Sequence, residues 1–287
     1  MMEGLCYTAR KAGTGESSAE LMANIYIHPE RSAPRFRPFK AWSHMQKLLV
    51  DQEDTEQAFQ VIEALNGRAQ LTNLERFADS EAGAVQLQRK EYLPPLLDDH
   101  AWIRDLPDGT VGRAYVDFME REGLSAQGLV DESQKMRSAG RDYNDDLKWF
   151  GNRLRDTHDL CHVLSGYGRD VLGEACLLGF TYSQNPGRGA IFIAYLTARK
   201  LSKHLPKGAH VMDCLWEGKR NGREASPIIR EDIIALLHEP LEDARRRLNI
   251  RKPVAYLNAL KVSAAASIAS RDIRSGESAA TDPQVAA

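Results

Sequence analysis

Apolar residues recur along most of this chain at intervals of three and four, which is the spacing of an amphipathic helix. The first segment with this spacing begins near Ala41. Further segments cover residues 54–67, 71–78, 110–123, 143–162, 191–201, 211–218 and 233–248. No stretch alternates apolar and polar residues with the period of two that marks a half-buried strand, and there is no internal repeat. The pattern therefore predicts an all-α fold.

Residues that cap and end helices stand at the expected places. Asp54 can accept hydrogen bonds from the first free amides of its helix, and Thr110 can do the same for a helix that ends at Gly123. Ser226-Pro227 is typical of a helix start, because proline fits the first helical position. Asn221-Gly222-Arg223 is predicted to be a turn between helices.

The longest periodic run lies in the middle of the chain. Its inward-facing stripe consists of Tyr143, Leu147, Phe150 and Leu154. On one continuous helix the next positions of this stripe are His158, Cys161 and His162, so the histidines are predicted to face the interior. A lone histidine on such a face is most often a core residue with a hydrogen-bond partner. Two histidines four residues apart, next to Asp159, favour metal ligands instead.

A carboxylate from further along the chain completes the candidate site. Glu174 follows His162 by twelve residues and would lie about 120° away from it on a straight helix. Gly166 and Gly168 interrupt that helix, and Asp170 can cap a second one whose first turn contains Glu174. A reversal at the glycines would bring the carboxylate back to the histidines. Taken alone, Glu174 is more typical of a first-turn residue that interacts with the helix dipole; together with the histidines it is predicted to be a ligand.

Two imidazoles and two carboxylates form a ligand set for a divalent cation. The residues expected to hold zinc, or alternatively iron, manganese or cobalt, are His158, Asp159, His162 and Glu174. Zinc would act as a Lewis acid or polarise water, whereas iron held by two histidines and a carboxylate would allow oxygen chemistry. The pattern is not that of a metalloprotease, in which a glutamate directly follows the first histidine. His204 and His210 are isolated and are not expected to be ligands.

Composition narrows the classes of function. The chain has 287 residues, of which 43% are apolar, so it can bury a large core. Its formal net charge of −2 provides no basic field, so no nucleic-acid partner is expected. No apolar run reaches the roughly 18 residues of a membrane span, so a lipid would be met at the membrane surface or through a pocket. The four cysteines show no paired spacing, which indicates reduced thiols in an intracellular protein.

One domain is predicted between two disordered ends. Residues 1–30 mix acidic and basic side chains without an apolar segment, so we expect a flexible leader and neither a signal peptide nor a transit peptide. Residues 262–287 are rich in serine and alanine and have little to bury, so we expect a disordered tail. The helical domain is expected over residues 31–252.

Two basic stretches each have two interpretations. Arg35-Phe36-Arg37-Pro38-Phe39-Lys40 leads into the helix near Ala41 and is either a surface turn or a docking site for an anionic head group. Arg245-Arg246-Arg247 is either a solvated helix face or a contact with an anionic membrane. The sequence leaves both alternatives open.

Several motifs occur in an order that resembles a known family. They are His158-Asp159-x-x-His162, the eleven-residue spacer ending at Gly173 before Glu174, Arg35-Phe36-Arg37-Pro38, the Asp54-Thr55 helix, Leu106-Pro107-Asp108-Gly109-Thr110, Gly112-x-Ala114-Tyr115 and Asn221-Gly222-Arg223. Together they resemble the coenzyme Q (ubiquinone) biosynthesis protein 4 family from roughly Arg35 to Ile250. No position of the metal motif is missing.

The resemblance implies a mostly helical protein of ubiquinone biosynthesis that binds a divalent metal, usually zinc. It implies a carboxy-lyase that removes the ring carboxylate of a polyprenylated 4-hydroxybenzoate-type precursor, with hydroxylation of the same carbon. The residues that would be both metal-binding and catalytic are His158, Asp159, His162 and Glu174. The implied location is peripheral on a membrane, either the cytoplasmic side of a bacterial inner membrane or the mitochondrial inner membrane. The implied partners are the prenylated ring lipid, the membrane surface, other coenzyme Q biosynthesis enzymes and a second copy in a homodimer.

Two other functions remain open. One is a scaffold that binds prenylated intermediates and organises the biosynthetic complex around a structural metal. The other is a metal phosphohydrolase, although the sequence has no further histidine-aspartate set at suitable spacing. The helix Ile191–Leu201 is a candidate wall for a prenyl tail or ordinary core. Replacing a carboxylate by a hydroxyl needs a two-electron oxidant, and zinc does not change oxidation state, so the oxidant is undefined at this level.

Overall fold

Helices make up nearly all the regular structure of the described residues, which confirms the all-α prediction. The computed structural model describes residues 6–7, 25–32, 35–51, 54–137 and 143–280. Its first eight helices are α1 (Pro38–Val50), α2 (Thr55–Asn66), α3 (Ala69–Ala78), α4 (Glu81–Arg89), α5 (Pro94–Leu97), α6 (His100–Arg104), α7 (Val111–Glu122) and α8 (Ala126–Arg137). The later ones are α9 (Asp146–Asp156), α10 (His158–Ser165), α11 (Val171–Gln184), α12 (Arg188–Leu201), α13 (Val211–Glu224), α14 (Ile233–His238), α15 (Leu241–Arg247) and α16 (Val254–Ala280), with two 3-10 turns at Lys207–Ala209 and Ile228–Arg230.

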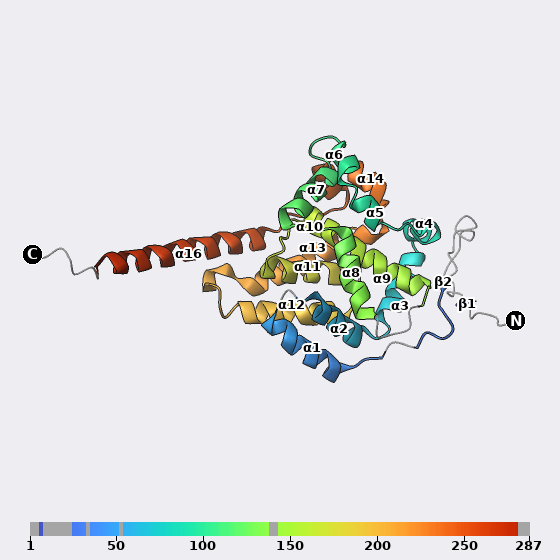
Figure 1. The fold of residues 1–287 in the computed structure, drawn as a ribbon, viewed down its shortest axis with the longest axis horizontal. Coiled ribbons are helices and arrows are strands. Elements are labelled where there is room, and N and C mark those ends of the chain that lie inside the picture. Colours follow the sequence, from blue (N-terminus) through green and yellow to red (C-terminus); the bar gives the residue numbers. More distant parts are fainter. Residues whose placement is uncertain (1–5, 8–24, 33–34, 52–53, 138–142, 281–287) are drawn as a thin grey trace, which may run out of the picture.

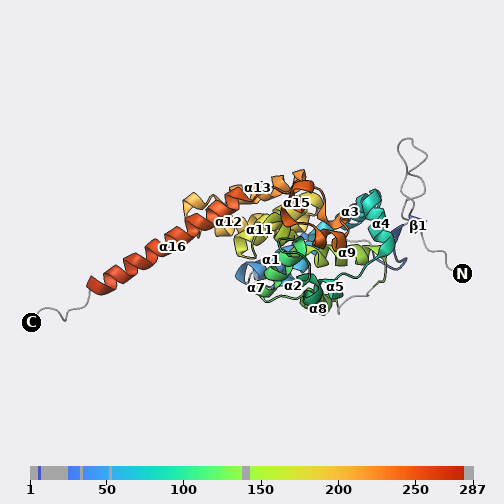
Figure 2. The same ribbon diagram turned by 90° about the horizontal axis from the view of Figure 1, so that it is seen from above.

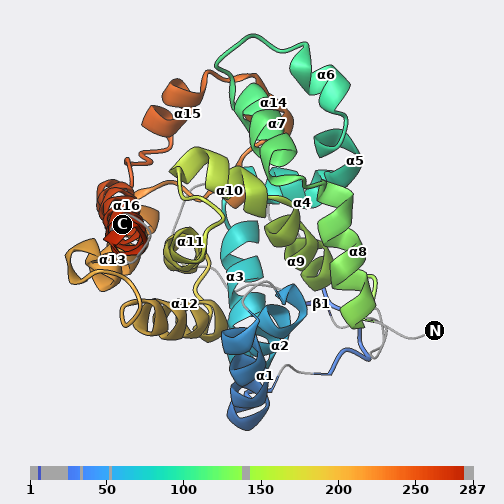
Figure 3. The same cartoon turned by 60° about the vertical axis from the view of Figure 1, so that its left-hand side comes forward.

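Helix α11 lies in the middle of these helices (Figure 1). Figure 3 looks nearly along it and shows α10, α12 and α13 around it, and all three contact it. A helix that is apolar all round is typical of a protein interior. The buried residues of α11 are Leu172, Gly173, Ala175, Cys176, Leu177, Gly179 and Phe180. Four of them, Leu172, Cys176, Leu177 and Phe180, join the largest hydrophobic cluster, which also includes side chains of α7, α10 and α13.

Helices α11 and α13 touch backbone to backbone. A Cβ atom on Gly218 would stand 2.4 Å from the carbonyl oxygen of Cys176, and one on Gly222 would stand 2.1 Å from that of Phe180. Because these glycines are four residues apart, they lie on one face of α13. The predicted turn at 221–223 is therefore wrong: α13 continues to Glu224, and Gly222 serves close helix packing.

The predicted helix ends are mostly correct. Asp54 caps α2 by accepting a hydrogen bond from the amide of Gln57 at 3.1 Å, and Thr110 caps α7. Helix α7 ends at Gly123, which has the positive φ of +66° that favours glycine. Pro227 is an exception, because it precedes only the short 3-10 turn that begins at Ile228.

The last residues of the segment predicted to be a leader contact the helical domain. Cys6–Tyr7 (β1) and Ile25–Tyr26 (β2) form a two-residue antiparallel pair. Ile25 is buried against the cluster that contains Phe150, and the amide of Tyr26 donates to Oδ2 of Asp146 at 2.7 Å. The rest of the predicted leader up to residue 24 lies outside the described residues. The chain thus joins the domain several residues before position 31.

The C-terminal segment begins as a long helix, and its expected disorder from residue 262 stays a prediction. Helix α16 starts in the core, where Tyr256 and Ala259 are buried, and then projects from the other helices (Figures 1 and 2). It continues to Ala280, through most of the segment predicted to be disordered from residue 262, whereas residues 281–287 lie outside the described part. Alanine is the strongest helix former and needs no burial to favour a helix. None of the described helices is both long and apolar enough to cross a bilayer.

Candidate metal centre

The helix that carries the two histidines is separate from the one before it. α9 ends at Asp156 and α10 starts at His158, so the continuous helix predicted from the apolar phase is divided at Thr157. The hydroxyl of Thr157 donates to the carbonyl of Arg153 at 2.8 Å, and the carbonyl of Thr157 accepts from the amide of Cys161. Thr157 thus closes one helix and opens the next, which sets the orientation of α10 independently of α9.

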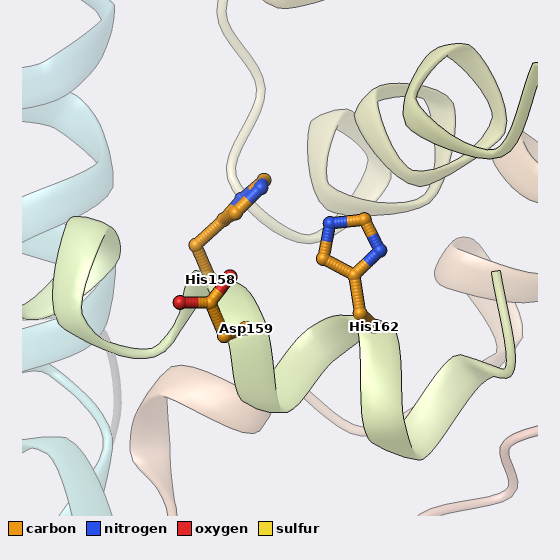
Figure 4. Close-up of side chains that lie close together, drawn as sticks. All are labelled: His158, Asp159 and His162. Atoms are coloured by element: carbon orange, nitrogen blue, oxygen red, sulfur yellow. The ribbon is translucent and has the colours of Figure 1, made fainter. Parts of the chain in front are cut away.

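The two imidazoles stand on the same side of α10 (Figure 4). Their ring centroids are 4.9 Å apart and their planes are nearly perpendicular, at 88°. Asp159 lies next to His158, and the ligand atoms of the three residues are within 4.8 Å of one another. The spacing of four residues therefore produces the pair that the sequence predicts. Among the described residues this is the group of histidine, cysteine and acidic side chains that meets the geometry of a metal site.

Glu174 returns to the histidines as the glycine pattern predicts. Gly166 ends α10 with φ +78°, and Asp170 caps α11 by accepting from the amides of Leu172 and Gly173, both at 3.1 Å. Oε1 of Glu174 lies 3.3 Å from Nε2 of His162, and its Oε2 lies 3.8 Å from Nε2 of His158. One carboxylate therefore faces both rings, from a different helix.

The reversal between the two helices is compact because of a glycine contact. A Cβ atom on Gly173 would stand 2.1 Å from the carbonyl oxygen of Gly168. Only glycine permits this approach, which places the first turn of α11 directly against the loop that leaves α10. Glu174 is the next residue, so its position depends on this contact.

His162 is prepared to act as a ligand. Its Nδ1 lies 2.9 Å from the carbonyl oxygen of Tyr167, and since a carbonyl only accepts, Nδ1 carries the proton. Nε2 is therefore the nitrogen left for the centre; it is buried and faces Oε1 of Glu174 at 3.3 Å. Phe118 stacks on the ring at 5.4 Å and fixes its plane. A ligating histidine typically has its second nitrogen bound in this way, so the residues fit a metal ion.

The charges of the site are coupled. Burial raises the pKa of Glu174, but the hydrogen bonds and charges of His158 and His162 lower it more, so the pKa of this carboxyl lies well below its usual range. Burial lowers the pKa of His158, and Glu174 more than reverses this, so that pKa is raised. Without a metal, the cluster thus holds a proton on imidazole beside an ionised carboxylate.

Cys161 lies within the motif but is not part of the group of ligand atoms formed by His158, Asp159 and His162. Burial, and then the charge of Asp159, raise the pKa of its thiol to about 12. The group that the structure brings together thus offers nitrogen and oxygen donors.

One side of the centre is open to solvent. The side chain of His162 is fully buried, whereas those of His158 and Glu174 are 32% and 33% exposed. The prediction that both histidines continue the buried stripe is therefore wrong for His158. The turn at Thr157 changes the helical phase, so the first histidine comes to the edge of the core.

Residues far along the chain support the site, and no pattern in the sequence indicates this role. Arg245 donates to the carbonyls of Val163 and Leu164, each at 2.9 Å, and so satisfies the end of α10. Arg246 and Arg247 form ion pairs with acidic side chains of their own region. The arginine run therefore has protein partners. Its solvated-face interpretation is wrong for Arg245.

A second support comes from α16. The hydroxyl of Tyr256 donates to Oδ2 of Asp170 and accepts from the amide of Gly168 at 3.0 Å. It fixes the loop between the two helices that carry the candidate ligands. Arg169, in the same loop, places its Nε 3.8 Å from Oε1 of Glu174.

Tyr115 of α7 lies on the inner side of the centre. It is fully buried, and its hydroxyl has no partner among the described residues. Burial, followed by the charge of Asp159, raises the pKa of this phenol. His204 and His210 lie outside the cluster; His210 is exposed and faces Asp213 at 3.5 Å.

Comparison with known protein families assigns the chain to one of them. The family model described as coenzyme Q (ubiquinone) biosynthesis protein Coq4 matches residues 46–254, which include all helices around the centre. The chain belongs to the Coq4 family. It is accordingly a ubiquinone biosynthesis protein, as the motif order suggests.

Curated relatives agree with this assignment. The chain is 28% identical over 190 residues to the mitochondrial ubiquinone biosynthesis protein COQ4 homolog of Danio rerio, which covers 66% of this chain and 67% of that protein. It is 30% identical over 156 residues to the mitochondrial coq-4 protein of Neurospora crassa, covering 53% and 41%. For the COQ4 protein of Scheffersomyces stipitis the values are 26% over 163 residues, 55% and 47%. The chain thus spans about half the length of the two fungal proteins.

A solved structure shares the fold. It is the crystal structure of a protein from Nostoc punctiforme described as a candidate ubiquinone biosynthesis protein. The TM-score is 0.59 at 19% identity, over 76% of this chain and all of that one. At this identity the likeness concerns the fold alone.

Proposed function

We propose that this Coq4 protein is a metal-dependent decarboxylase of a polyprenylated 4-hydroxybenzoate-type ring, acting at a membrane surface. In this proposal the chain's role in ubiquinone biosynthesis is to break the bond between the ring and its carboxylate. The ligands of the divalent metal would be His158, Asp159, His162 and Glu174. Other coenzyme Q biosynthesis enzymes would supply the prenylated acid and consume the product.

The observation that carries the proposal is the state of His162. Its Nδ1 is bound to a backbone carbonyl, while its buried Nε2 faces Oε1 of Glu174 at 3.3 Å, beside a second imidazole and Asp159. Metal ligands must be deprotonated, so a bound metal ion would take the place of a proton between this nitrogen and the carboxylate. Imidazole and carboxylate donors suit zinc and also suit iron, manganese and cobalt.

The open side of the centre favours an enzyme over a scaffold with a structural metal. Structural zinc sites are closed, whereas catalytic sites keep a position for substrate. The partial exposure of His158 and Glu174 provides such a side. Phe118, which is buried and stacks on His162, covers the ring of that histidine.

The reaction follows from the substrate's own electronics and from the charges of the centre. As the hydroxyl para to the carboxylate loses its proton, it pushes electrons towards the ring carbon that bears the carboxylate, so that this carbon takes up an electrophile and the para oxygen becomes a carbonyl. When the bond to the carboxylate then breaks, its electron pair returns to the ring and to the para oxygen, and the ring becomes aromatic again. A bound divalent ion would supply a Lewis acid for a substrate oxygen. Arg169, beside Glu174, adds a positive charge at the open side, where the carboxylate of the substrate would enter. Replacing the carboxylate by hydroxyl removes two electrons from the ring; the proposed oxidant is dioxygen, which takes up these electrons and two protons to leave as hydrogen peroxide, while water provides the hydroxyl oxygen and the carboxylate leaves as carbon dioxide.

The proposal is tested with the purified chain and a prenylated 4-hydroxybenzoate in detergent. We expect loss of carbon dioxide by mass spectrometry, abolished by a chelator and restored by added metal. Oxygen exclusion separates the two outcomes, because hydroxylated product needs dioxygen and simple decarboxylation does not. His158→Ala should lose turnover while circular dichroism keeps its helical signal.

Two results would contradict the proposed chemistry. Full turnover by His158→Ala would show that the centre is not catalytic. Absence of product together with unfolding on metal removal would favour the scaffold with a structural metal.

A further inference from the structure

Helix α1 exposes large apolar side chains on its outer side. It lies at the edge of the helices (Figures 1 and 3) and buries Ala41, Met45 and Leu48 against α2 and α12. On its outer side Phe39 is 91% exposed and Val50 is 89% exposed. At about 100° per residue these two positions differ by only about 20°, so they lie on one line at opposite ends of the helix.

Further aromatic side chains lie near the start of α1. Trp42 lies about 60° to one side of Phe39 and is 49% exposed. Phe36, in the segment before α1, is 52% exposed, and the guanidinium of Arg188 stands over its ring at 5.3 Å. The polar and exposed Ser43 and Gln46 lie between Phe39 and Val50, so the aromatic side chains gather at the N-terminal end of the helix. Single exposed apolar residues are ordinary, but several exposed aromatic side chains within one short segment are typical of an interaction site.

The same segment is strongly basic. Residues 35–50 contain two arginines and two lysines and no aspartate or glutamate, although the whole chain has a net charge of −2. Lys47 and Lys40 lie about 80–100° from Phe39, on the side opposite Trp42. Arg35 and Arg37 are exposed at the start of the helix. We call the outer residues of 35–50 the α1 face.

We infer that the α1 face docks the protein on a lipid bilayer that contains anionic head groups. A helix with aromatic side chains in the middle and lysines at the flank lies in the interface of a bilayer, with the apolar side chains below the head groups. Each lysine or arginine near an anionic surface contributes about 1 kcal/mol. The inference extends the proposed action on a lipid-tailed ring, since it names the surface that would meet that lipid.

The positive charge of the α1 face favours an anionic bilayer over a second copy of the chain as its partner. A two-fold dimer places the same patch against itself, so the four basic side chains of one copy would face the four of the other. Like charges facing each other across an interface are costly. An anionic bilayer meets the same charges with the opposite sign.

Vesicle co-sedimentation of the full chain tests the inference. The probes are vesicles of phosphatidylcholine alone and of phosphatidylcholine mixed with phosphatidylglycerol. We expect binding to the mixed vesicles that weakens with salt, and a loss of about fivefold in partitioning for Lys47→Gln. Phe39→Ser combined with Trp42→Ala should abolish binding.

The matched control is Tyr92→Ser, which removes an aromatic ring that is 57% exposed outside the α1 face. It should bind like the parent chain. Equal binding of the parent and the Phe39→Ser, Trp42→Ala variant overturns the inference. So does conversion of a dimer to a monomer by that variant in light scattering, because the face would then belong to a second copy.

The assay needs neither turnover nor metal, so its failure is distinguishable from failure of the proposed reaction. If vesicles are not bound but detergent-dispersed substrate is decarboxylated, only the docking inference falls. If vesicles are bound through α1 and no product forms, only the proposed reaction falls.

Discussion

Replacing Gly218 of α13 by alanine should displace α11 and so disturb the candidate metal centre. The added methyl group would stand 2.4 Å from the carbonyl oxygen of Cys176. Carbon atoms pack favourably at about 3.5 Å and beyond, so α11 and α13 must separate by about 1 Å. Cys176 is two residues from Glu174 on α11, whereas the histidines are on α10, which is fixed separately by Arg245. The carboxylate should therefore move away from the imidazoles.

The magnitude follows from two opposing terms. Forcing a methyl group into a packed interior costs about 1–3 kcal/mol, while exchanging glycine for alanine within a helix returns up to about 1 kcal/mol. We expect the free energy of unfolding of protein freed of metal by a chelator to fall by about 1–2 kcal/mol, as measured by urea denaturation. Zinc affinity, measured by competition with a chromophoric chelator, should fall about tenfold, as for other changes to the support of a ligand.

Gly208 provides the control. A Cβ atom there would meet its nearest neighbour, Cγ1 of Val262, at 3.6 Å, which is ordinary contact. Gly208→Ala should therefore change the free energy of unfolding by no more than about 0.5 kcal/mol and leave the zinc affinity unchanged. If Gly218→Ala behaves like Gly208→Ala in both measurements, the helices are not packed backbone to backbone and the reasoning fails.

Three further predictions concern the centre and its supports. First, in protein freed of metal by a chelator, this cluster should stabilise the fold most between about pH 4.3 and 6.5. Folding lowers the pKa of Glu174, so the contribution of Glu174 to the free energy of unfolding is lost as pH falls. Folding raises the pKa of His158, so the contribution of His158 is lost as pH rises. Urea denaturation across pH checks this, and a matching profile in His158→Ala would refute it. Second, Tyr115→Phe should raise the stability of chelated protein by about 1 kcal/mol, because the hydroxyl it removes is buried without a described partner; destabilisation would mean that the hydroxyl is bonded after all. Third, Arg245→Ala should lower stability by about 1–3 kcal/mol through the carbonyls it leaves unpaired, and hydrogen exchange should increase at the end of α10; unchanged exchange would contradict the capping role.

Local signals in the sequence predicted local structure well. Asp54 and Thr110 cap helices, and Gly123 and Gly166 end them, because each acts through atoms within a few residues. The return of Glu174 to the histidines was also predictable. Its spacing excludes a single straight helix, and the glycines between provide the reversal.

Signals with two physical meanings gave the errors. Gly222 can open a turn or admit a neighbouring backbone, and only the position of Phe180 decides between them. The apolar phase continues smoothly from α9 into α10, so the break at Thr157 leaves no mark in the pattern of hydrophobic residues. The roles of Arg245 and Tyr256 could not be predicted from local sequence patterns, because their partners are about 80 residues away in the chain.

The long separation between the candidate ligands and their supports has a consequence for biosynthesis. The ligands lie within the span 158–174, while the hydrogen bonds that fix their helices come from Arg245, 81 residues after Leu164, and Tyr256, 86 residues after Asp170. A growing chain leaves the ribosome from its N-terminus, so it exposes the ligands well before it can hold them in place. At the proposed metal site, capture of an ion would then be a late event that follows the emergence of α15 and α16.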